Sequence, residues 1–236
     1  MALSADIEDR LREGLAMMDV VIGDASLQKA MGYLDMLLTR TKKVNLTGIR
    51  NPQEAVEKHL IDSLVLVPLI DRLPATIDPT FNGRGAANAN KGALMDIGTG
   101  GGVPGIPLKC ARPEIKVSLV EAKAKKVRFL KDAIQKLGLK GIRAYHHFLD
   151  PECPVDFLGR YDWIVSRASL PIVDFVRSAI LYKKEHGALL LMKGPKVDEE
   201  LQEAAGQIQR LGLNIDQRIR FQLPFSKAER AIIVLK

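Results

Sequence analysis

The sequence predicts an α/β fold: a mostly parallel β-sheet with helices on both faces, an antiparallel last strand and an N-terminal helical extension. Three observations lead to this fold class. Apolar residues recur at helical spacing through residues 1–73. From residue 93 on, short apolar runs alternate with amphipathic helical stretches, which is the pattern of repeated βα units. A glycine-rich turn joins the first of these runs to the helix that follows it.

Three helices are expected in residues 1–73. Apolar stripes with steps of three and four residues predict them. Asn51 predicts the start of the third helix because asparagine is a good N-cap. Pro52 suits the first helical position, and Glu54 can complete a capping box. The stripes are Leu3, Ile7, Leu11, Leu15 and Met18, then Leu27, Met31, Leu34 and Leu38, then Val56, Leu60, Leu64 and Val67.

Residues 74–92 interrupt this pattern. They contain two prolines, three glycines and three asparagines, so we expect a flexible loop between the helical segment 1–73 and a domain of residues 93–236. The last two expected strands have no helix between them and can form a hairpin, which makes the final strand antiparallel. The domain is expected to contain strands at 93–97, 115–120, 142–148, 161–165, 188–192, 218–222 and 230–235, and helices at 104–111, 122–137, 171–182 and 197–211.

The composition excludes several classes of protein. Among 236 residues, 47% are hydrophobic and 27% charged, which rules out disordered and fibrous chains. The longest apolar runs, at 64–67 and 188–192, are far shorter than the roughly 20 residues of a membrane span. Cys110 and Cys153 make neither a CxxC motif nor a disulfide framework, so no metal site is expected. We expect a cytoplasmic monomer without a secretory signal.

The excess of positive charge lies after residue 90. The net charge of +7 divides into −2 for residues 1–90, +6 for residues 91–160 and +3 for residues 161–236. A basic surface attracts polyanions, and nucleic acid phosphates are the commonest of these, although the charge can also serve solubility alone.

The glycine-rich turn has the spacing acidic-x-Gly-x-Gly-x-Gly, formed by Asp96, Gly98, Gly100 and Gly102. Val103 stands where the dinucleotide fingerprint ends in glycine, and the Gly-Lys-Ser/Thr ending of a phosphate-binding loop is absent. The spacing resembles motif I of the class I S-adenosylmethionine-dependent methyltransferases. Glu121 ends the next strand, where a carboxylate can accept hydrogen bonds from both hydroxyls of a ribose.

Several further segments make the resemblance more specific. Together they resemble the bacterial 16S ribosomal RNA guanine-N7 methyltransferases, the family also called glucose-inhibited division protein B. The resemblance implies a Rossmann-like class I methyltransferase sheet for residues 93–236. The segments that carry it are Asn45-Leu46-Thr47, His59-Leu60-Ile61-Asp62-Ser63, residues 96–108, Lys126-Val127-Arg128-Phe129-Leu130, Ser166-Arg167-Ala168 and Lys193-Gly194.

The resemblance also implies a cofactor, a substrate and site residues. The family transfers a methyl group from S-adenosylmethionine to N7 of one guanine in the small ribosomal subunit. Gly98 and Val103 would line the methionine part of the cofactor, and Glu121 would hold the ribose. Leu149 and Asp150 would flank the adenine. The full set of expected cofactor residues is Asp96, Gly98, Gly100, Gly102, Val103, Glu121, Leu149, Asp150 and Arg167.

On the substrate side we expect Asn45, His59, Arg167 and Lys193. Arg167 and Lys193 each end a predicted strand at the same edge as the glycine turn, where a cation can contact guanine O6 or a phosphate. Either cation could instead pair with a loop carboxylate. His59 could instead pair with Asp62 to dock the N-terminal helices. Guanine N7 carries a lone pair and no proton, so we assign no catalytic acid or base.

Two other functions compete with this prediction. An NAD-dependent oxidoreductase could use the same fold, but Val103 breaks the dinucleotide fingerprint. A nucleic-acid-binding module without catalysis could carry a vestigial cofactor site, but the motif from Asp96 to Gly102 and Glu121 are both intact.

Overall fold

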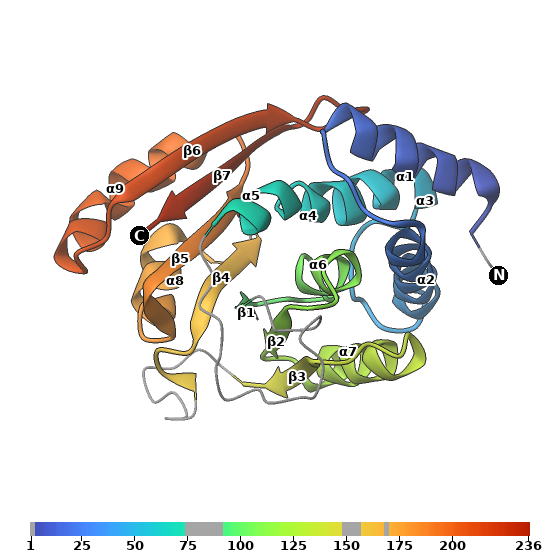
Figure 1. The fold of residues 1–236 in the computed structure, drawn as a ribbon, viewed down its shortest axis with the longest axis horizontal. Helices are drawn as coiled ribbons and strands as arrows, with labels where there is room; N and C mark the ends of the chain where they lie inside the picture. Colours follow the sequence, from blue (N-terminus) through green and yellow to red (C-terminus); the bar gives the residue numbers. More distant parts are fainter. Residues whose placement is uncertain (1–2, 74–91, 148–156, 168–169) are drawn as a thin grey trace.

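The computed structural model describes residues 3–73, 92–147, 157–167 and 170–236 (Figure 1). A seven-stranded sheet in the order β3-β2-β1-β4-β5-β7-β6 organises these residues. Its first five strands are parallel, and β7 runs antiparallel to both of its neighbours, β5 and β6. The antiparallel last strand is therefore confirmed. The strands are β1 (Ala93–Ile97), β2 (Lys116–Glu121), β3 (Ile142–His146), β4 (Tyr161–Arg167), β5 (Lys183–Lys193), β6 (Ile215–Gln222) and β7 (Glu229–Leu235).

The helices follow the expected order with one irregularity. The third expected helix is broken into α3, a π-helical turn η1, α4 and α5. Asn51 caps α3 as predicted, accepting hydrogen bonds from Gln53 N and Glu54 N at 2.9 and 3.1 Å. The helices are α1 (Ala5–Met17), α2 (Asp24–Thr41), α3 (Pro52–Ala55), η1 (Val56–Ile61), α4 (Asp62–Leu64), α5 (Val67–Arg72), α6 (Gly105–Ala111), α7 (Ala124–Lys136), α8 (Ile172–Ala179) and α9 (Val197–Arg210).

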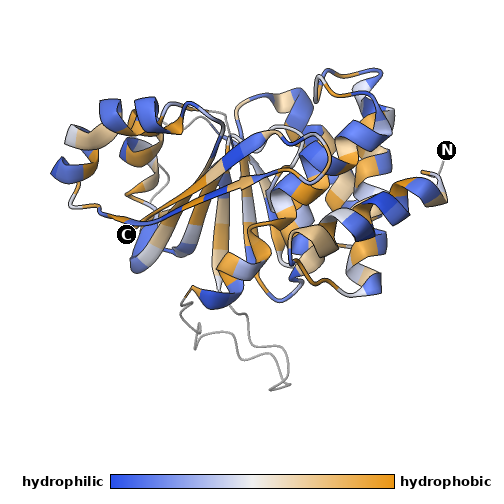
Figure 2. Cartoon of the chain, turned by 90° about the horizontal axis from the view of Figure 1, so that it is seen from above, coloured by the Kyte–Doolittle hydropathy of each residue, from blue (hydrophilic) through white to orange (hydrophobic). Residues whose placement is uncertain are grey.

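Helices cover both faces of the sheet, as the alternating pattern predicts (Figure 1). Helices α8 and α9 pack on one face against side chains such as Met95 and Ile164. The N-terminal helices, α6 and α7 cover the other face, where side chains such as Leu94 and Val165 point. Figure 2 shows the hydrophobic residues concentrated along the strands and on the helix sides that face them.

The N-terminal helices share a hydrophobic core with the sheet. Leu34 and Leu60 belong to the same buried cluster as Leu119 and Phe129. Helix α2 packs against α6 and α7, so residues 3–73 form part of one helical layer on the sheet. Almost all of the predicted loop at 74–92 lies outside the described residues, and the division of the chain at this loop stays a prediction. None of the described helices is long and apolar enough to cross a membrane.

Candidate functional site

The glycine-rich turn lies at the carboxyl end of β1, between β1 and α6. Gly98, Gly100 and Gly102 have φ angles of 68°, 60° and 106°, a backbone region that side chains with a Cβ rarely adopt. The amides of Gly98 and Thr99 donate to the carbonyl of Val120 at 3.0 and 3.1 Å, which ties the turn to β2. The sequence pattern therefore produces the tight glycine turn that was expected after β1.

Asp96 lies buried beneath this turn. Its Oδ2 accepts hydrogen bonds from Thr99 Oγ1 at 2.6 Å and from Gly105 N at 2.8 Å. Its Oδ1 is buried and has no hydrogen-bond partner among the described residues. Burial raises the pKa of Asp96 to about 6. A buried carboxylate oxygen without a partner is costly, and a positively charged ligand above it would relieve that cost.

Glu121 lies beside the turn at the end of β2, with only 6% of its surface exposed. Its two carboxylate oxygens accept hydrogen bonds from Gly100 N and Lys123 N, both at 2.9 Å. Each oxygen has a second lone pair, so the carboxylate can still accept bonds from two ligand hydroxyls. Glu121 is therefore held beside the turn by two backbone amides, and its contact with a ribose stays a prediction.

The underside of the turn is supported by the N-terminal helices, which the sequence analysis did not foresee. The hydroxyl of Tyr33 in α2 donates to the carbonyl of Gly101 at 2.8 Å, and burial raises the pKa of this phenol. A Cβ on Gly101 would lie 2.8 Å from the side chain of Leu37 and 3.7 Å from the carbonyl oxygen of Leu46. Val103 follows the turn and is 9% exposed. The spacing of residues 31–38 predicts the helix but gives no signal for this contact.

Arg167 ends β4 at the same edge of the sheet. Its guanidinium donates to the backbone carbonyl of Lys58, to Asp62 Oδ2 at 3.2 Å and to His59 Nδ1 at 3.3 Å. Its side chain is 19% exposed. Arg167 thus does hold a carboxylate, but Asp62 lies in helix α4 and not in a loop as the alternative interpretation expected. Part of the surface of Arg167 is still exposed.

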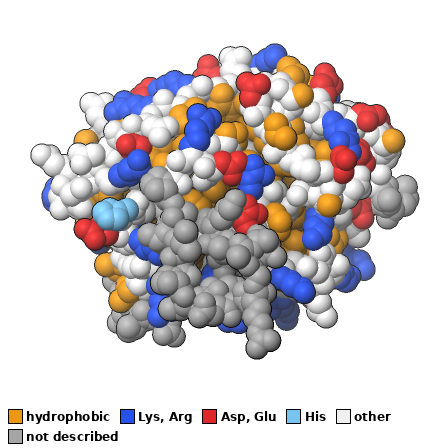
Figure 3. All heavy atoms as spheres, viewed as in Figure 1, with side chains coloured by type: hydrophobic (Ala, Val, Ile, Leu, Met, Phe, Trp, Pro, Cys, Tyr) orange, Lys and Arg blue, Asp and Glu red, His pale blue; other side chains and the backbone are white. Residues whose placement is uncertain are grey.

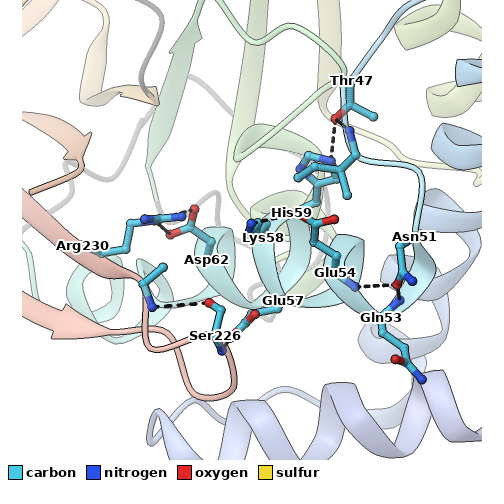
Figure 4. Close-up of polar contacts among 12 residues, drawn as sticks. Thr47, Asn51, Gln53, Glu54, Glu57, Lys58, His59, Asp62, Ser226 and Arg230 are labelled. Atoms are coloured by element: carbon cyan, nitrogen blue, oxygen red, sulfur yellow. Dashed lines mark hydrogen bonds and ion pairs between the residues drawn. The ribbon is translucent and has the colours of Figure 1, made fainter.

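His59 is buried and contacts both Arg167 and Thr47. Figure 4 shows its contact with Thr47. An arginine can only donate, so His59 Nδ1 accepts, and Nε2–H donates to Thr47 Oγ1 at 2.9 Å. Burial, together with the charge of Arg167, lowers the pKa of His59 to about 3. The imidazole is therefore neutral near pH 7, and its one lone pair is already used.

The remaining predicted site residues are Lys193, Asn45, Leu149 and Asp150, and the structure describes only the first two. Lys193 is 7% exposed and donates to the carbonyl of Leu170 at 2.7 Å and to Glu200 Oε2 at 2.6 Å. Lys193 thus pairs with a carboxylate, but Glu200 lies in helix α9 and not in a loop as the alternative interpretation expected. Asn45 is exposed in the turn between α2 and α3. Leu149 and Asp150 lie outside the described residues.

The sequence analysis missed one arginine and one glutamate of the same region. Arg230 of β7 approaches Asp62, and Glu57 of η1 accepts hydrogen bonds from the turn between β6 and β7. Their partners lie about 170 positions away in the sequence, so no local pattern could have revealed them. Among the described residues, no group of three or more His, Cys, Asp or Glu side chains could hold a metal ion.

A glycine turn after the first parallel strand and a carboxylate after the second define a class of fold that binds nucleoside-type cofactors at this edge. Residues 26–222 match the family of rRNA small subunit methyltransferase G, and the chain belongs to this family. It is 35% identical to "Ribosomal RNA small subunit methyltransferase G" of Anaeromyxobacter sp. over 94% of each chain. It is 32% identical to the protein of the same name from Pelotomaculum thermopropionicum, over 98% of this chain and 90% of the relative.

Solved structures agree on the fold. Fibrillarin of Aeropyrum pernix, crystallised with bound S-adenosyl-L-methionine, aligns with a TM-score of 0.51 at 17% identity, over 61% of this chain and 66% of that one. TrmN from Thermus thermophilus aligns with a TM-score of 0.51 at 15% identity, over 75% of this chain and 48% of that one. At these identities the likeness shows the shared fold alone.

Proposed function

We propose that this protein transfers a methyl group from S-adenosylmethionine to N7 of a guanine in 16S ribosomal RNA. Membership in the rRNA small subunit methyltransferase G family is the observation that carries the proposal. The proposed substrate is the RNA or the small ribosomal subunit, and such a substrate supports a cytoplasmic location for the enzyme. A monomer suffices for a site made from one chain.

The residues around the glycine turn suit S-adenosylmethionine. Oδ1 of Asp96 is buried without a hydrogen-bond partner among the described residues, and a nearby positive charge would stabilise it. The cofactor carries both a sulfonium and an ammonium charge. Gly98 and Gly100 let the ligand approach the backbone, and Val103 follows them two residues before helix α6 begins. Glu121 is held by two backbone amides and keeps the capacity to accept both ribose hydroxyls. When bound, the cofactor supplies an electrophilic methyl group.

Among the described residues, the imidazole of His59 is not available as a proton acceptor, because its one lone pair already accepts from Arg167. The carboxylates of Asp96 and Glu121 are assigned to cofactor binding, and N7 as the acceptor atom requires no base. Guanine N7 attacks with its own in-plane lone pair and releases no proton. The guanine ring gains the positive charge that the sulfonium loses. The protein therefore has to orient two reactants, which can contribute roughly 7–11 kcal/mol to catalysis.

Exposed cations flank the edge where RNA has to approach. Lys123 and Lys125 stand at the N-terminus of α7, where the helix dipole disfavours cations, so an anionic partner would offset their cost. Lys42 and Lys43 are exposed in the turn after α2, and Leu46 of the same turn lies next to Gly101. These two lysines of the N-terminal segment therefore extend the basic surface that was expected only after residue 90. The described residues on the face drawn in Figure 3 include basic, acidic and apolar side chains side by side.

Binding and methyl incorporation test this function together. Calorimetry with S-adenosylhomocysteine and with NADH should show binding of the first and none of the second. The purified protein should then transfer labelled methyl groups to ribosomal RNA from cells that lack it. Binding of NADH would favour an oxidoreductase, and RNA binding without methyl incorporation would favour a module that only binds nucleic acid.

A further inference from the structure

Asp62 lies between two arginines that belong to distant strands. Its side chain is 5% exposed. Arg167 Nη1 of β4 is 3.2 Å from Oδ2, and Arg230 Nε of β7 is 3.3 Å from both Oδ1 and Oδ2. Figure 4 shows the side chains of Asp62 and Arg230 facing one another beside η1. One buried carboxylate thus balances two guanidinium groups.

This arrangement fixes the direction of Arg167. Without the carboxylate, two guanidinium charges would face each other in a largely buried space and would repel. The contacts to Lys58, His59 and Asp62 use three of the five N–H groups of Arg167. The exposed part of the guanidinium is therefore oriented by groups that all lie on η1 and α4. A π-helical turn often marks a functional site, and here it supplies two of these three partners.

The C-terminal hairpin holds the other side of Asp62 in place. Glu57 of η1 is buried and accepts hydrogen bonds from Phe225 N and Ser226 N at 2.7 and 2.8 Å. The guanidinium of Arg10 in α1 stacks on the ring of Phe225 at 3.6 Å. These contacts fasten the turn between β6 and β7 to η1, so Arg230 reaches Asp62 from an anchored strand.

We propose that Asp62 is a positioning residue for methyl transfer, which holds the guanidinium of Arg167 at the carboxyl edge of the sheet. Arg230 in turn holds the carboxylate of Asp62 in place. The proposal rests on the proposed function, in which Arg167 faces the cofactor and the RNA. Asp62 does not touch either reactant. It acts through Arg167, and it couples the C-terminal hairpin to the site.

Asp62→Asn tests this role, with Asp71→Asn as its matched control. Asp71 also joins the N-terminal segment to the rest of the chain, through Arg112 at the end of α6 away from the glycine turn, and it is 44% exposed. Asp62→Asn should lower the single-turnover rate of methyl transfer by about tenfold or more, because misplacing an orienting group is costly. Asp71→Asn should change that rate by about twofold or less. Thermal unfolding of both variants shows whether each is folded.

A double-mutant cycle separates positioning from general stabilisation. Combined with Arg167→Lys, which loses the forked geometry, Asp62→Asn should lower the rate by only about threefold or less. A full tenfold loss in both backgrounds, or equal effects of Asp62→Asn and Asp71→Asn, would overturn the proposal. If Asp62→Asn does not fold, Arg230→Gln takes its place. It should slow transfer and Arg230→Lys should restore part of the rate, whereas a wild-type rate in Arg230→Gln contradicts the proposal.

The wild-type protein in the same assay keeps the two proposals distinguishable. A wild-type protein that binds no S-adenosylhomocysteine and incorporates no methyl group contradicts the proposed function. An active wild-type protein whose rate is unchanged by Asp62→Asn contradicts only the positioning role.

Discussion

The two sides of the carboxyl edge of the sheet are built in different ways. Beside β1 and β2, residues 96–102 make a turn from glycines and backbone amides, and the carboxylates stand at the strand ends. Beside β4, Arg167 is held by residues that lie more than one hundred positions away in the sequence. The first side is a local structure that one segment specifies. The second exists only when the N-terminal helices, β4 and the C-terminal hairpin have assembled.

The largest expected effect is the loss of cofactor binding on the local side. Gly98→Val should abolish binding of S-adenosylmethionine, because a β-branched side chain disfavours the φ of 68° and would occupy the space of the ligand. Gly212→Val is the matched control, since Gly212 has a φ of 67° at the end of α9, away from the turn. Both variants should lose similar stability, and only Gly98→Val should lose binding by calorimetry. Normal affinity in folded Gly98→Val would refute the cofactor site.

The contrast between the two sides also explains what the sequence could predict. Every residue of β1 but the first is buried, so the strand consists mostly of apolar residues. This apolar run is why the sequence predicts the strand from Ala93 to Ile97. The strand β5 begins at Lys183 rather than at residue 188, because its first residues are polar and partly exposed and give no apolar signal. The π-helical turn η1 keeps the apolar spacing of a helix, so periodicity does not reveal it.

Side-chain networks between distant segments were harder to predict than the motif. Asp96, the glycines and Glu121 follow from spacing along two adjacent βα units, and the structure brings them together. The hydroxyl of Tyr33 beneath Gly101 and the approach of Arg230 to Asp62 depend on tertiary packing alone. Sequence patterns report local periodicity, so such contacts appear only when the fold is known.

A smaller loss of binding is expected at the ribose position. Glu121→Gln removes the charge that two backbone amides now bind, and it replaces one acceptor oxygen with a donor. The affinity for S-adenosylhomocysteine should fall about 10- to 100-fold, in line with hydrogen bonds to a charged group. Glu114→Gln, at the opposite end of β2, serves as the control and should bind normally. Equal affinities in both variants would exclude Glu121 from the cofactor site.

On the non-local side, His59 should make stability depend on pH. Its pKa is about 3 in the folded protein and about 6.5 when unfolded, so only the unfolded state gains a proton as the pH falls through this window. Wild type should therefore lose about 1 kcal/mol between pH 6 and 5 relative to His59→Asn. The raised pKa of Asp96 acts in the opposite direction, but it is present in both proteins and cancels. Urea unfolding at each pH measures the free energy of unfolding of both proteins. If the two free energies change with pH in parallel, the prediction is contradicted.

The smallest expected effect is on the pH dependence of the chemical step. Single-turnover methyl transfer at saturating RNA and cofactor should be nearly level from about pH 6.5 to 8.5, because N7 loses no proton and His59 stays neutral. His59→Asn should lower the rate without changing the shape of this profile. A rise through a pKa near 6.5 that disappears in His59→Asn would make His59 a base and would point to a nucleophile that carries a proton.

The position of the methyl group on the RNA tests the central claim most directly. Small ribosomal subunits and free 16S RNA from cells that lack this protein would be incubated with the purified protein and S-adenosylmethionine. Mass mapping would locate the modified guanine, and borohydride reduction followed by aniline would break the RNA at an N7-methylated base. The account predicts one methylated guanine and chain cleavage at that position. A methylated guanine that resists cleavage, or methyl incorporation at another base, would contradict it.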